Sequence, residues 1–388
     1  MPSVNESLAD RILTHAIYLE RIKAGLIKET LRQLNTLEKS LIRDLQNANL
    51  TTFRKDRYER LLALVRDTIR TSYRTMRNGN HADLVDLADL ESQWTVRALN
   101  GAVGVEAGVA IDVASIAWST KQLEAIVSDA VLDGEVIATW WGKQASDLRL
   151  RFADTVKQGL LRGETTAEIV RKIRGGKGVE GIGLIETKRR QAEMLVRTSI
   201  STVSHEARMA TYGENQEVLR GYQQRSVLDA RTSNICIAYS NKTWALDGTP
   251  LGHTLPMRPF PRHWGERSQL LPITKSWSEL AGRPIAQADN KTLDQLFQQR
   301  LRDMGWDEER IAKARRRTQA SMDGQISRDI SYEEFFAKKE KTFQRDVLGP
   351  GRFELYEKGL LRSLSDLVDF RGNPLTLKQL RDRYGLFG

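Results

Sequence analysis

The sequence predicts an α+β protein that is predominantly helical, with a long N-terminal helical hairpin or bundle followed by a mixed, turn-rich C-terminal domain. A seam of apolar residues with helical spacing covers the first 45 residues. Helical periodicity then disappears between residues 219 and 273, where Pro, Gly, Asn and aromatic residues gather. The length of 388 residues and the hydrophobic share of 40% allow two or three domains with a real core.

The first helix is predicted by apolar or semi-apolar residues that recur at steps of four and three. Ser3 and Glu6 have the spacing of a capping box at its start. The seam predicts one helix of about forty residues that packs against a partner helix, in the same chain or in another. Its members are Leu8, Ile12, His15, Leu19, Ile22, Leu26, Leu31, Leu34, Leu37, Leu41 and Leu45.

Two further helices complete the predicted N-terminal hairpin or bundle. The first has an apolar face from Tyr58 to Met76 and is expected to stop at Asn78-Gly79-Asn80, because Gly and Asn are poor helix formers. The second runs from about Ala82 to Leu99, and a Gly- and Ala-rich connector then spans residues 101–118. Short breaks between long helices indicate antiparallel neighbours.

Capping residues and glycines divide the rest of the chain. Ser119-Thr120 caps a helix that Asp133-Gly134 ends, and a Thr within Glu164-Thr165-Thr166-Ala167-Glu168 caps another whose first turn is acidic. Residues 222–227 look like a short strand. The expected helices cover residues 120–132, 136–161, 164–174, 186–212, 293–304 and 307–320.

These patterns divide the chain into four regions. Residues 1–100 form a helical docking region, and residues 101–185 form a helical linker domain. Residues 186–280 form a core that contains the Asp-x-Arg-Thr, Cys and His motif described below. Residues 281–388 form a C-terminal extension of helices and turns.

The charge of the chain favours an acidic partner. Sixty Lys and Arg against fifty Asp and Glu leave a net charge of +10, which suits nucleic acid, although ordinary Arg-rich helices explain it equally well. The candidate contacts to phosphates are Arg189, Arg190, Arg315, Arg316 and Arg317. Such contacts would hold the DNA backbone without reading its sequence, and a solvated helix face is the alternative interpretation.

Composition also limits the compartment. A single cysteine excludes an internal disulfide and fits a reducing environment. The N-terminus lacks the basic and apolar regions of a secretory signal. The longest apolar run, residues 101–118, contains Glu106 and Asp112 and is too short and too polar to span a bilayer. We therefore expect no membrane association.

The segment from Leu228 to Pro272 holds the only cysteine, Cys236, and His263 between turn formers. Cys, His and carboxylate side chains are the common zinc ligands, so Cys236, His253, His263 and Glu266 are candidates, but no Cys-x-x-Cys pair is present. Cys236 with His263 as base and Asp229 as orienting group supplies the parts of a thiol nucleophile, but no oxyanion-binding loop is evident.

A structural interpretation explains the same residues better. Asp229 after a strand accepts backbone N–H groups in a turn, and Arg231 forks onto a carboxylate or onto carbonyls. Thr232 and Ser233 cap a helical turn that points Cys236 inward. We therefore expect a structural centre with no catalytic residue, cofactor or metal. Its members are Asp229, Arg231, Thr232, Cys236, Pro261, His263 and Arg267.

Taken as a set, these motifs resemble the phage head-morphogenesis family, the minor head proteins typified by phage Mu protein F and phage SPP1 protein 7. The resemblance covers roughly residues 115–385. The matching pieces are residues 159–169, Arg-Thr-Ser at 197–199, Leu-Asp-Ala-Arg-Thr-Ser at 228–233, Cys236, Gly248, Pro-Arg-His-x-x-x-Arg-Ser at 261–268, residues 343–352, and Asp369 with residues 372–377. Family members usually have a second cysteine where this chain has Glu266.

The resemblance implies a minor head protein of a tailed phage that is not an enzyme. It would act in procapsid assembly with the portal protein and with scaffold or major capsid protein, and in packaging or ejection of double-stranded DNA. It would lie in the capsid interior or at the portal vertex, after assembly in the host cytoplasm. Two alternatives remain, a metal-dependent nuclease using Cys236, His263 and Glu266, and an internal virion DNA-binding protein without portal contact.

Overall fold

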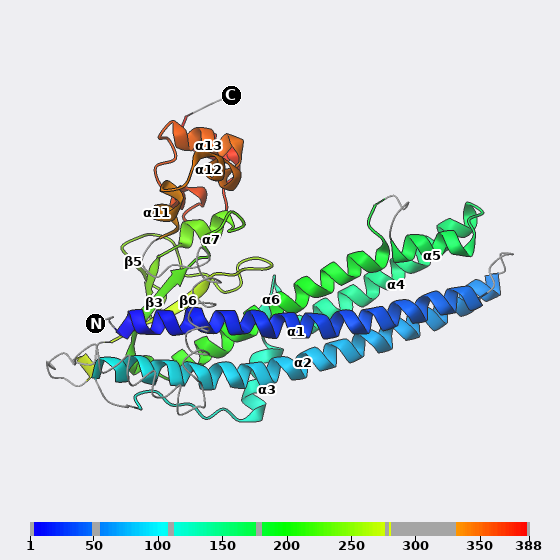
Figure 1. The fold of residues 1–388 in the computed structure, drawn as a ribbon, viewed down its shortest axis with the longest axis horizontal. Helices are drawn as coiled ribbons and strands as arrows, with labels where there is room; N and C mark the ends of the chain where they lie inside the picture. The colour runs from blue at the N-terminus through cyan, green and yellow to red at the C-terminus, as the bar shows by residue number, and fades with distance from the viewer. Residues whose placement is uncertain are drawn as a thin grey trace, which may run out of the picture.

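The molecule is a long helical rod with a mixed domain at one end (Figure 1). The computed structural model describes residues 4–48, 55–107, 112–175, 181–275, 279–280 and 331–385. Helices dominate and two small sheets accompany them, so the predicted predominantly helical α+β class is confirmed.

The first two helices form one antiparallel pair that runs the length of the rod. Helix α1 covers Val4–Asn47 and helix α2 covers Lys55–Ala107. At 1.5 Å per residue they are about 65 Å and about 80 Å long. The predicted seam is buried between them, as Leu34 and Leu41 at 0% exposure show. The long first helix is confirmed, and it packs against α2 of the same chain. Ser3, the expected N-terminal cap, lies outside the described residues.

The expected helix break at Asn78-Gly79-Asn80 is wrong, because α2 continues through it. Asn80 is buried, and its Oδ1 accepts a hydrogen bond of 3.2 Å from the indole of Trp141. Met76 before the triplet and Leu84 after it are buried as well. This packing outweighs the helix-forming penalty of glycine, which is about 1 kcal/mol. Helix α2 also extends to Ala107, into the expected connector.

Helix α3, Thr120–Ser128, begins at a Ser119 capping box but ends before the expected Leu132. The chain instead forms a hairpin of β1, Val131–Leu132, and β2, Glu135–Val136. Asp133 and Gly134 occupy its turn with φ of 50° and 80°, conformations that a two-residue hairpin demands. The expected helix stop is therefore a hairpin turn.

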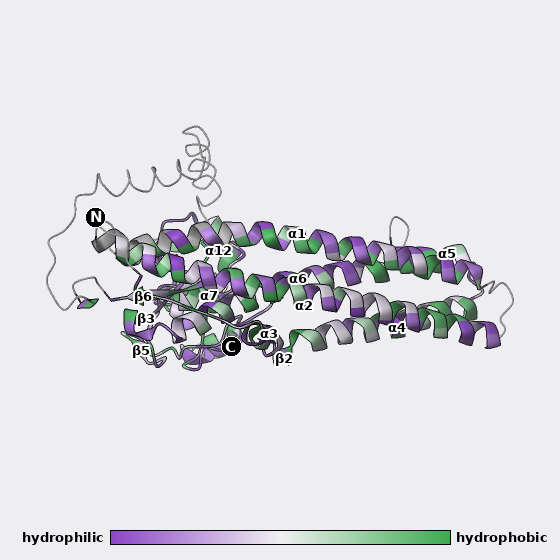
Figure 2. Cartoon of the chain, turned by 90° about the horizontal axis from the view of Figure 1, so that it is seen from below, coloured by the Kyte–Doolittle hydropathy of each residue, from purple (hydrophilic) through white to green (hydrophobic). Residues whose placement is uncertain are grey.

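The remaining bundle helices follow the sequence pattern closely. They are α4, Ile137–Leu161, α5, Thr166–Arg174, and α6, Leu184–Gly213. Thr165 and Glu168 form a capping box at the start of α5. Helices α1, α2, α4 and α6 lie side by side and share one apolar core (Figure 2). None of the helices in the described ranges combines the length and apolarity needed to cross a bilayer.

A four-stranded antiparallel sheet follows α6 through the short helix η1, Gln216–Val218. The strand order is β5-β4-β3-β6, so β3, Leu219–Arg225, is central. This is the expected strand, begun three residues earlier. Helix α7, Asn234–Tyr239, crosses between β3 and β4. The other strands are β4, Thr243–Ala245, β5, Pro250–Leu251, and β6, Gln269–Thr274.

The C-terminal residues form a small helical cap on this sheet domain (Figure 1). Its apolar core includes Leu228 and Ile237 from the sheet domain. The expected helices at 293–304 and 307–320, with Arg315, Arg316 and Arg317, lie outside the described residues. The cap elements are α11, Tyr332–Ala337, α12, Lys341–Leu348, α13, Pro350–Glu357, η2, Leu364–Leu367, and α14, Leu377–Arg383.

The continuous α2 makes a prediction about Gly79. A Cβ there meets no atom within 4 Å, and its φ is not positive, so Gly79→Ala should stabilise the protein by about 0.5–1 kcal/mol through the unfolded chain. Gly221→Ala is the contrasting control, because its Cβ would lie 2.2 Å from the Trp244 carbonyl oxygen. Denaturant unfolding should shift in opposite directions for the two variants. A loss of stability in Gly79→Ala would contradict a continuous α2.

Candidate functional site

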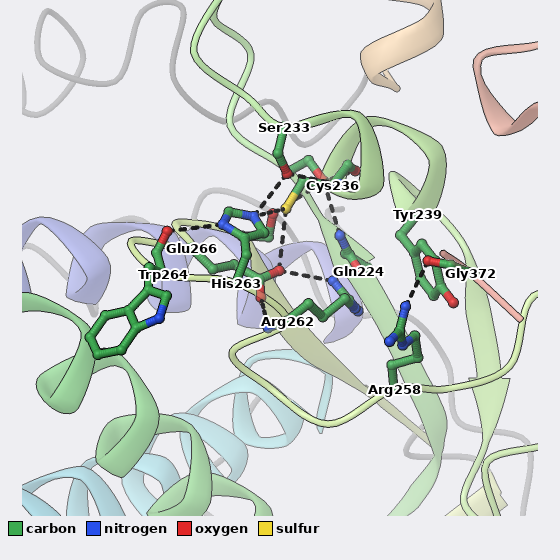
Figure 3. A network of polar contacts seen from close by, with 12 residues as sticks. Gln224, Ser233, Cys236, Tyr239, Arg258, Arg262, His263, Trp264, Glu266 and Gly372 are labelled. Carbon is green, nitrogen blue, oxygen red and sulfur yellow. Dashed lines mark hydrogen bonds and ion pairs between the residues drawn. The ribbon is translucent and has the colours of Figure 1, made fainter. Parts of the chain in front are cut away.

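The segment that the sequence singles out folds into a buried polar cluster, here called the knot, formed by Ser233, Cys236, Arg262, His263 and Glu266 (Figure 3). Ser233 caps α7 and Cys236 lies in its first turn. The other three belong to the loop that leads into β6. The central sheet thus places two segments about thirty residues apart in contact, with Cys236 only 2% exposed.

Glu266 and Arg262 form the charged centre of the knot. The Arg262 Nη1 donates to Glu266 Oε1 over 2.9 Å, and the Arg262 backbone N–H donates to Oε2 over 2.5 Å. Both side chains are only 1% exposed. The guanidinium also lies 4.2 Å from the ring centroid of Phe260 and 4.4 Å from that of Tyr239. Removing one partner of such a buried pair strongly destabilises the folded protein, because the other charge stays buried without a counter-ion.

His263 is held between two polar contacts so that its Nε2 faces the thiol. Its Nδ1 lies 3.0 Å from the Trp264 carbonyl oxygen, which can only accept, so Nδ1 bears the proton. Nε2 lies 2.8 Å from the Ser233 hydroxyl oxygen and 3.2 Å from the Cys236 sulfur, and the thiol donates to Glu266 Oε1 over 3.3 Å. Burial, and next the Glu266 charge, raise the pKa of the Cys236 thiol to about 12. The thiol is therefore protonated at neutral pH.

A second ion pair closes the turn next to the knot. Arg267 donates two bonds of 2.7 Å, one to each carboxylate oxygen of Asp229. Asp229 Oδ1 also accepts from the Arg231 backbone N–H at 3.0 Å and lies 3.2 Å from the Thr232 hydroxyl. The hydrogen bonds from Arg267 lower the pKa of Asp229 to about 2. The turn-forming role expected of Asp229 is what the structure shows.

Arg231 does not make the expected fork. Its side chain is 78% exposed and its Nη2 lies 3.5 Å from Asp229 Oδ2, so the bidentate pairing belongs to Arg267. Arg231 is the near neighbour of Asp229 in the sequence, and only the approach of the loop before β6 brings Arg267 to the same carboxylate. Pro261 follows a cis peptide bond and leads directly into Arg262.

Cys236, His263 and Glu266 offer ligand atoms that lie within 4.8 Å of one another, and their chemistry is that of zinc ligands. The environment does not fit a dication. Both oxygens of Glu266 are engaged by Arg262, whose positive charge would oppose a metal ion at the same carboxylate. His253 lies elsewhere, bonded to Thr243 and Leu255. We derive no chemistry through a metal from this cluster.

The nucleophile arrangement weighed from the sequence is not formed either. Asp229 pairs with Arg267, and the Trp264 carbonyl takes the place of an orienting carboxylate at His263. The thiol is buried and protonated. The knot can therefore hold two chain segments together, but it lacks an activated nucleophile.

The knot is also fastened to the rod and to the C-terminal cap. The Gly265 N–H donates to the Thr198 hydroxyl on α6 at 3.2 Å, and the Trp264 ring packs edge-on against Trp140 of α4. On the other side, Arg258 donates to the Gly372 carbonyl at 2.7 Å. Gly372 has φ of 77°, and a Cβ there would lie 2.0 Å from the Tyr239 hydroxyl, so only glycine fits.

The predicted phosphate contacts on α6 are already engaged within the protein. Arg189 pairs with Glu38 of α1 and donates to Asn35 at 2.7 Å. Arg190 donates to Glu186 one turn earlier at 3.2 Å. Arg189 therefore helps to join α6 to the hairpin, whereas Arg190 is paired within α6 itself.

Arg262 is the site residue that sequence reasoning missed. Its only signal is the spacing of four residues to Glu266, which is common on exposed helices and says nothing about burial. The aromatic residues that cover it, Phe260 and Tyr239, come from different parts of the segment. Only the folded arrangement reveals that this pair, and not the cysteine, is the charged centre.

A buried, internally paired cluster that ties a sheet domain to a helical rod is typical of a structural domain. Residues 151–263 match the model of a family described as phage Mu protein F like protein. This match supports the phage head-morphogenesis family of minor head proteins that the motifs predict, and it covers the segment from mid-α4 to His263. None of the curated proteins or solved structures compared with the chain matches it significantly.

The Asp229–Arg267 pair predicts a specific loss of stability. Asp229→Ala should cost about 1–3 kcal/mol, because it removes charge-assisted hydrogen bonds, whereas Arg231→Ala should change stability by less than about 0.5 kcal/mol. Because the pKa of Asp229 is lowered in the folded state, its contribution is present above about pH 4 and is lost as the pH falls towards 2. Thermal unfolding at pH 7 and pH 2.5 measures both effects. Equal losses of stability in the two variants at pH 7 would contradict a special role for the Asp229–Arg267 pair.

Glu266→Gln tests the knot itself. Removing the charge leaves Arg262 buried without a counter-ion, which should cost about 3–5 kcal/mol, and the apolar double variant Arg262→Met/Glu266→Leu should recover much of it. Wild-type protein should contain no stoichiometric zinc, and a chelator should leave its melting temperature unchanged. Stoichiometric zinc with chelator-induced destabilisation would replace the ion-pair account with a metal site.

Proposed function

We propose that this chain is a minor head protein of a tailed phage that acts with the portal protein in procapsid assembly. The observation that supports this most is the family match over residues 151–263, which includes four members of the knot, Ser233, Cys236, Arg262 and His263, and ends before Glu266. That family is one of phage head morphogenesis, which supports a capsid-related role for this chain. The long rod, with the sheet domain at one end, supplies extended helical faces for protein contacts (Figure 1).

The proposed partners are the portal protein, scaffold or major capsid protein, and packaged double-stranded DNA. The proposed location is the virion, at the portal vertex or in the capsid interior, after assembly in the host cytoplasm. A contribution to DNA packaging or ejection belongs to the same proposal. The net charge of +10 supports contact with DNA in the filled head.

We further propose that the protein is not an enzyme. Among the described residues, the Cys, His and carboxylate groups that suggested chemistry are paired with one another or with arginine. Cys236 and Glu266 are buried, which leaves little access for a substrate, and the thiol is protonated. These features support a structural role and disfavour the metal-dependent nuclease.

Co-expression with the portal, scaffold and major capsid genes of the same phage tests the proposal. The chain should co-sediment with portal-containing procapsids that hold no DNA, and it should be absent from shells assembled without the portal. Purified protein should not nick plasmid DNA with or without added divalent metal.

Two results would contradict this assignment. Association with heads only after DNA is packaged, with release by nuclease or high salt, would favour an internal DNA-binding protein without portal contact. Chelator-sensitive nicking that Glu266→Gln abolishes while the protein stays folded would favour the nuclease.

A further inference from the structure

An open groove between α2 and α4 is lined on both walls by arginine. Its volume is about 400 Å³. Arg66, Arg70, Arg74 and Arg77 come from α2, and Arg149 faces them from α4. All five side chains are exposed. No carboxylate is among the described residues that line it.

The sequence explains why the groove exists. The α2 arginines recur at steps of four, four and three, which keeps them on one helix face over about 16 Å. On the opposite wall α4 presents the small residues Gly142, Ala145 and Ser146, so the two helices leave space between their surfaces. The packing of α2 against α4 therefore creates a groove along which the α2 arginines are aligned.

These charges are poorly neutralised by the protein. Arg66 and Arg70 share one carboxylate, Asp67, at 3.6 Å and 3.3 Å. Within the described part of the chain, Arg74 and Arg149 have no ion-pair partner within 4 Å. This contrasts with Arg189 on α6, which is held by Glu38 and Glu186. The groove therefore keeps a strong positive field facing solvent.

We propose that this groove binds the phosphate backbone of double-stranded DNA. The guanidinium fork matches phosphate oxygens, and a row of such groups matches a polymer of regularly repeated charge better than a single small anion. Contacts of this kind position DNA without reading its sequence. The inference deepens the proposed function and rests on it in naming packaged DNA as the polyanion.

An acidic protein surface fits the groove less well. Stable protein interfaces depend on apolar or aromatic anchors at their centre. The aromatic residues at the base of this groove, Tyr73 and Trp141, are only 3% and 1% exposed. The accessible walls of the groove therefore present guanidinium groups. The buried aromatic base is poorly hydrated, which strengthens the positive electrostatic potential above it.

Salt-titrated binding of the full-length protein to a 30-base-pair duplex tests the groove. Five phosphate contacts predict a slope of log affinity against log salt of about −4.5, since each contributes about 0.9. Arg74→Glu/Arg149→Glu should lower the magnitude of the slope by about 2 and weaken binding at 100 mM salt at least tenfold. Arg74→Lys/Arg149→Lys keeps the charge and should retain the slope.

Arg97→Glu/Lys121→Glu is the matched control, because both side chains are exposed, lie outside the groove and give the same change in net charge. It should bind DNA nearly as the wild type does. Equal losses in the two glutamate variants, or a wild-type protein without salt-dependent binding, would overturn the proposal. Retained co-sedimentation of Arg74→Glu/Arg149→Glu with empty portal-containing procapsids separates this result from the proposed assembly function.

Discussion

Helix α6 is buried along most of its length, and both halves of the molecule pack against it. Its N-terminal two-thirds contribute Leu195, Ile200 and Val203 to the core of the rod, and Tyr212 near its end joins the core of the sheet domain. Arg208 makes the same connection with polar groups, since it lies 3.7 Å from the buried Glu91 of α2 and donates to Gln269 of β6 at 2.9 Å. The position of the sheet is thereby tied to the rod.

The knot extends this constraint to the loop before β6. Thr198 on α6 both donates to the Met194 carbonyl, at 2.7 Å, and accepts from Gly265, so one helix turn positions the loop that contains His263. Within the knot, the carboxylate of Glu266 balances the buried guanidinium of Arg262. Arg262 therefore closes this loop by charge pairing and aromatic packing.

Periodicity and capping predicted most elements because those signals are local. The seam through Leu34 and Leu41 predicted α1, and a Thr cap before an acidic first turn predicted α5. The failures are non-local. The Asn78-Gly79-Asn80 triplet stays helical because Trp141, about sixty residues away, bonds Asn80. Likewise, neither the choice of Arg267 over Arg231 by Asp229 nor the burial of Arg262 has a signal in the neighbouring sequence.

Arginine serves two opposite purposes in this chain, and the difference lies in what surrounds it. Arg262 and Arg208 are buried beside carboxylates, where an unpaired charge would cost several kcal/mol, so they fix the fold. The groove arginines stand on exposed helix surface, where leaving Arg74 without a carboxylate costs little because water solvates it. A rod held internally by paired charge can thus keep a separate row of positive charge open on its surface.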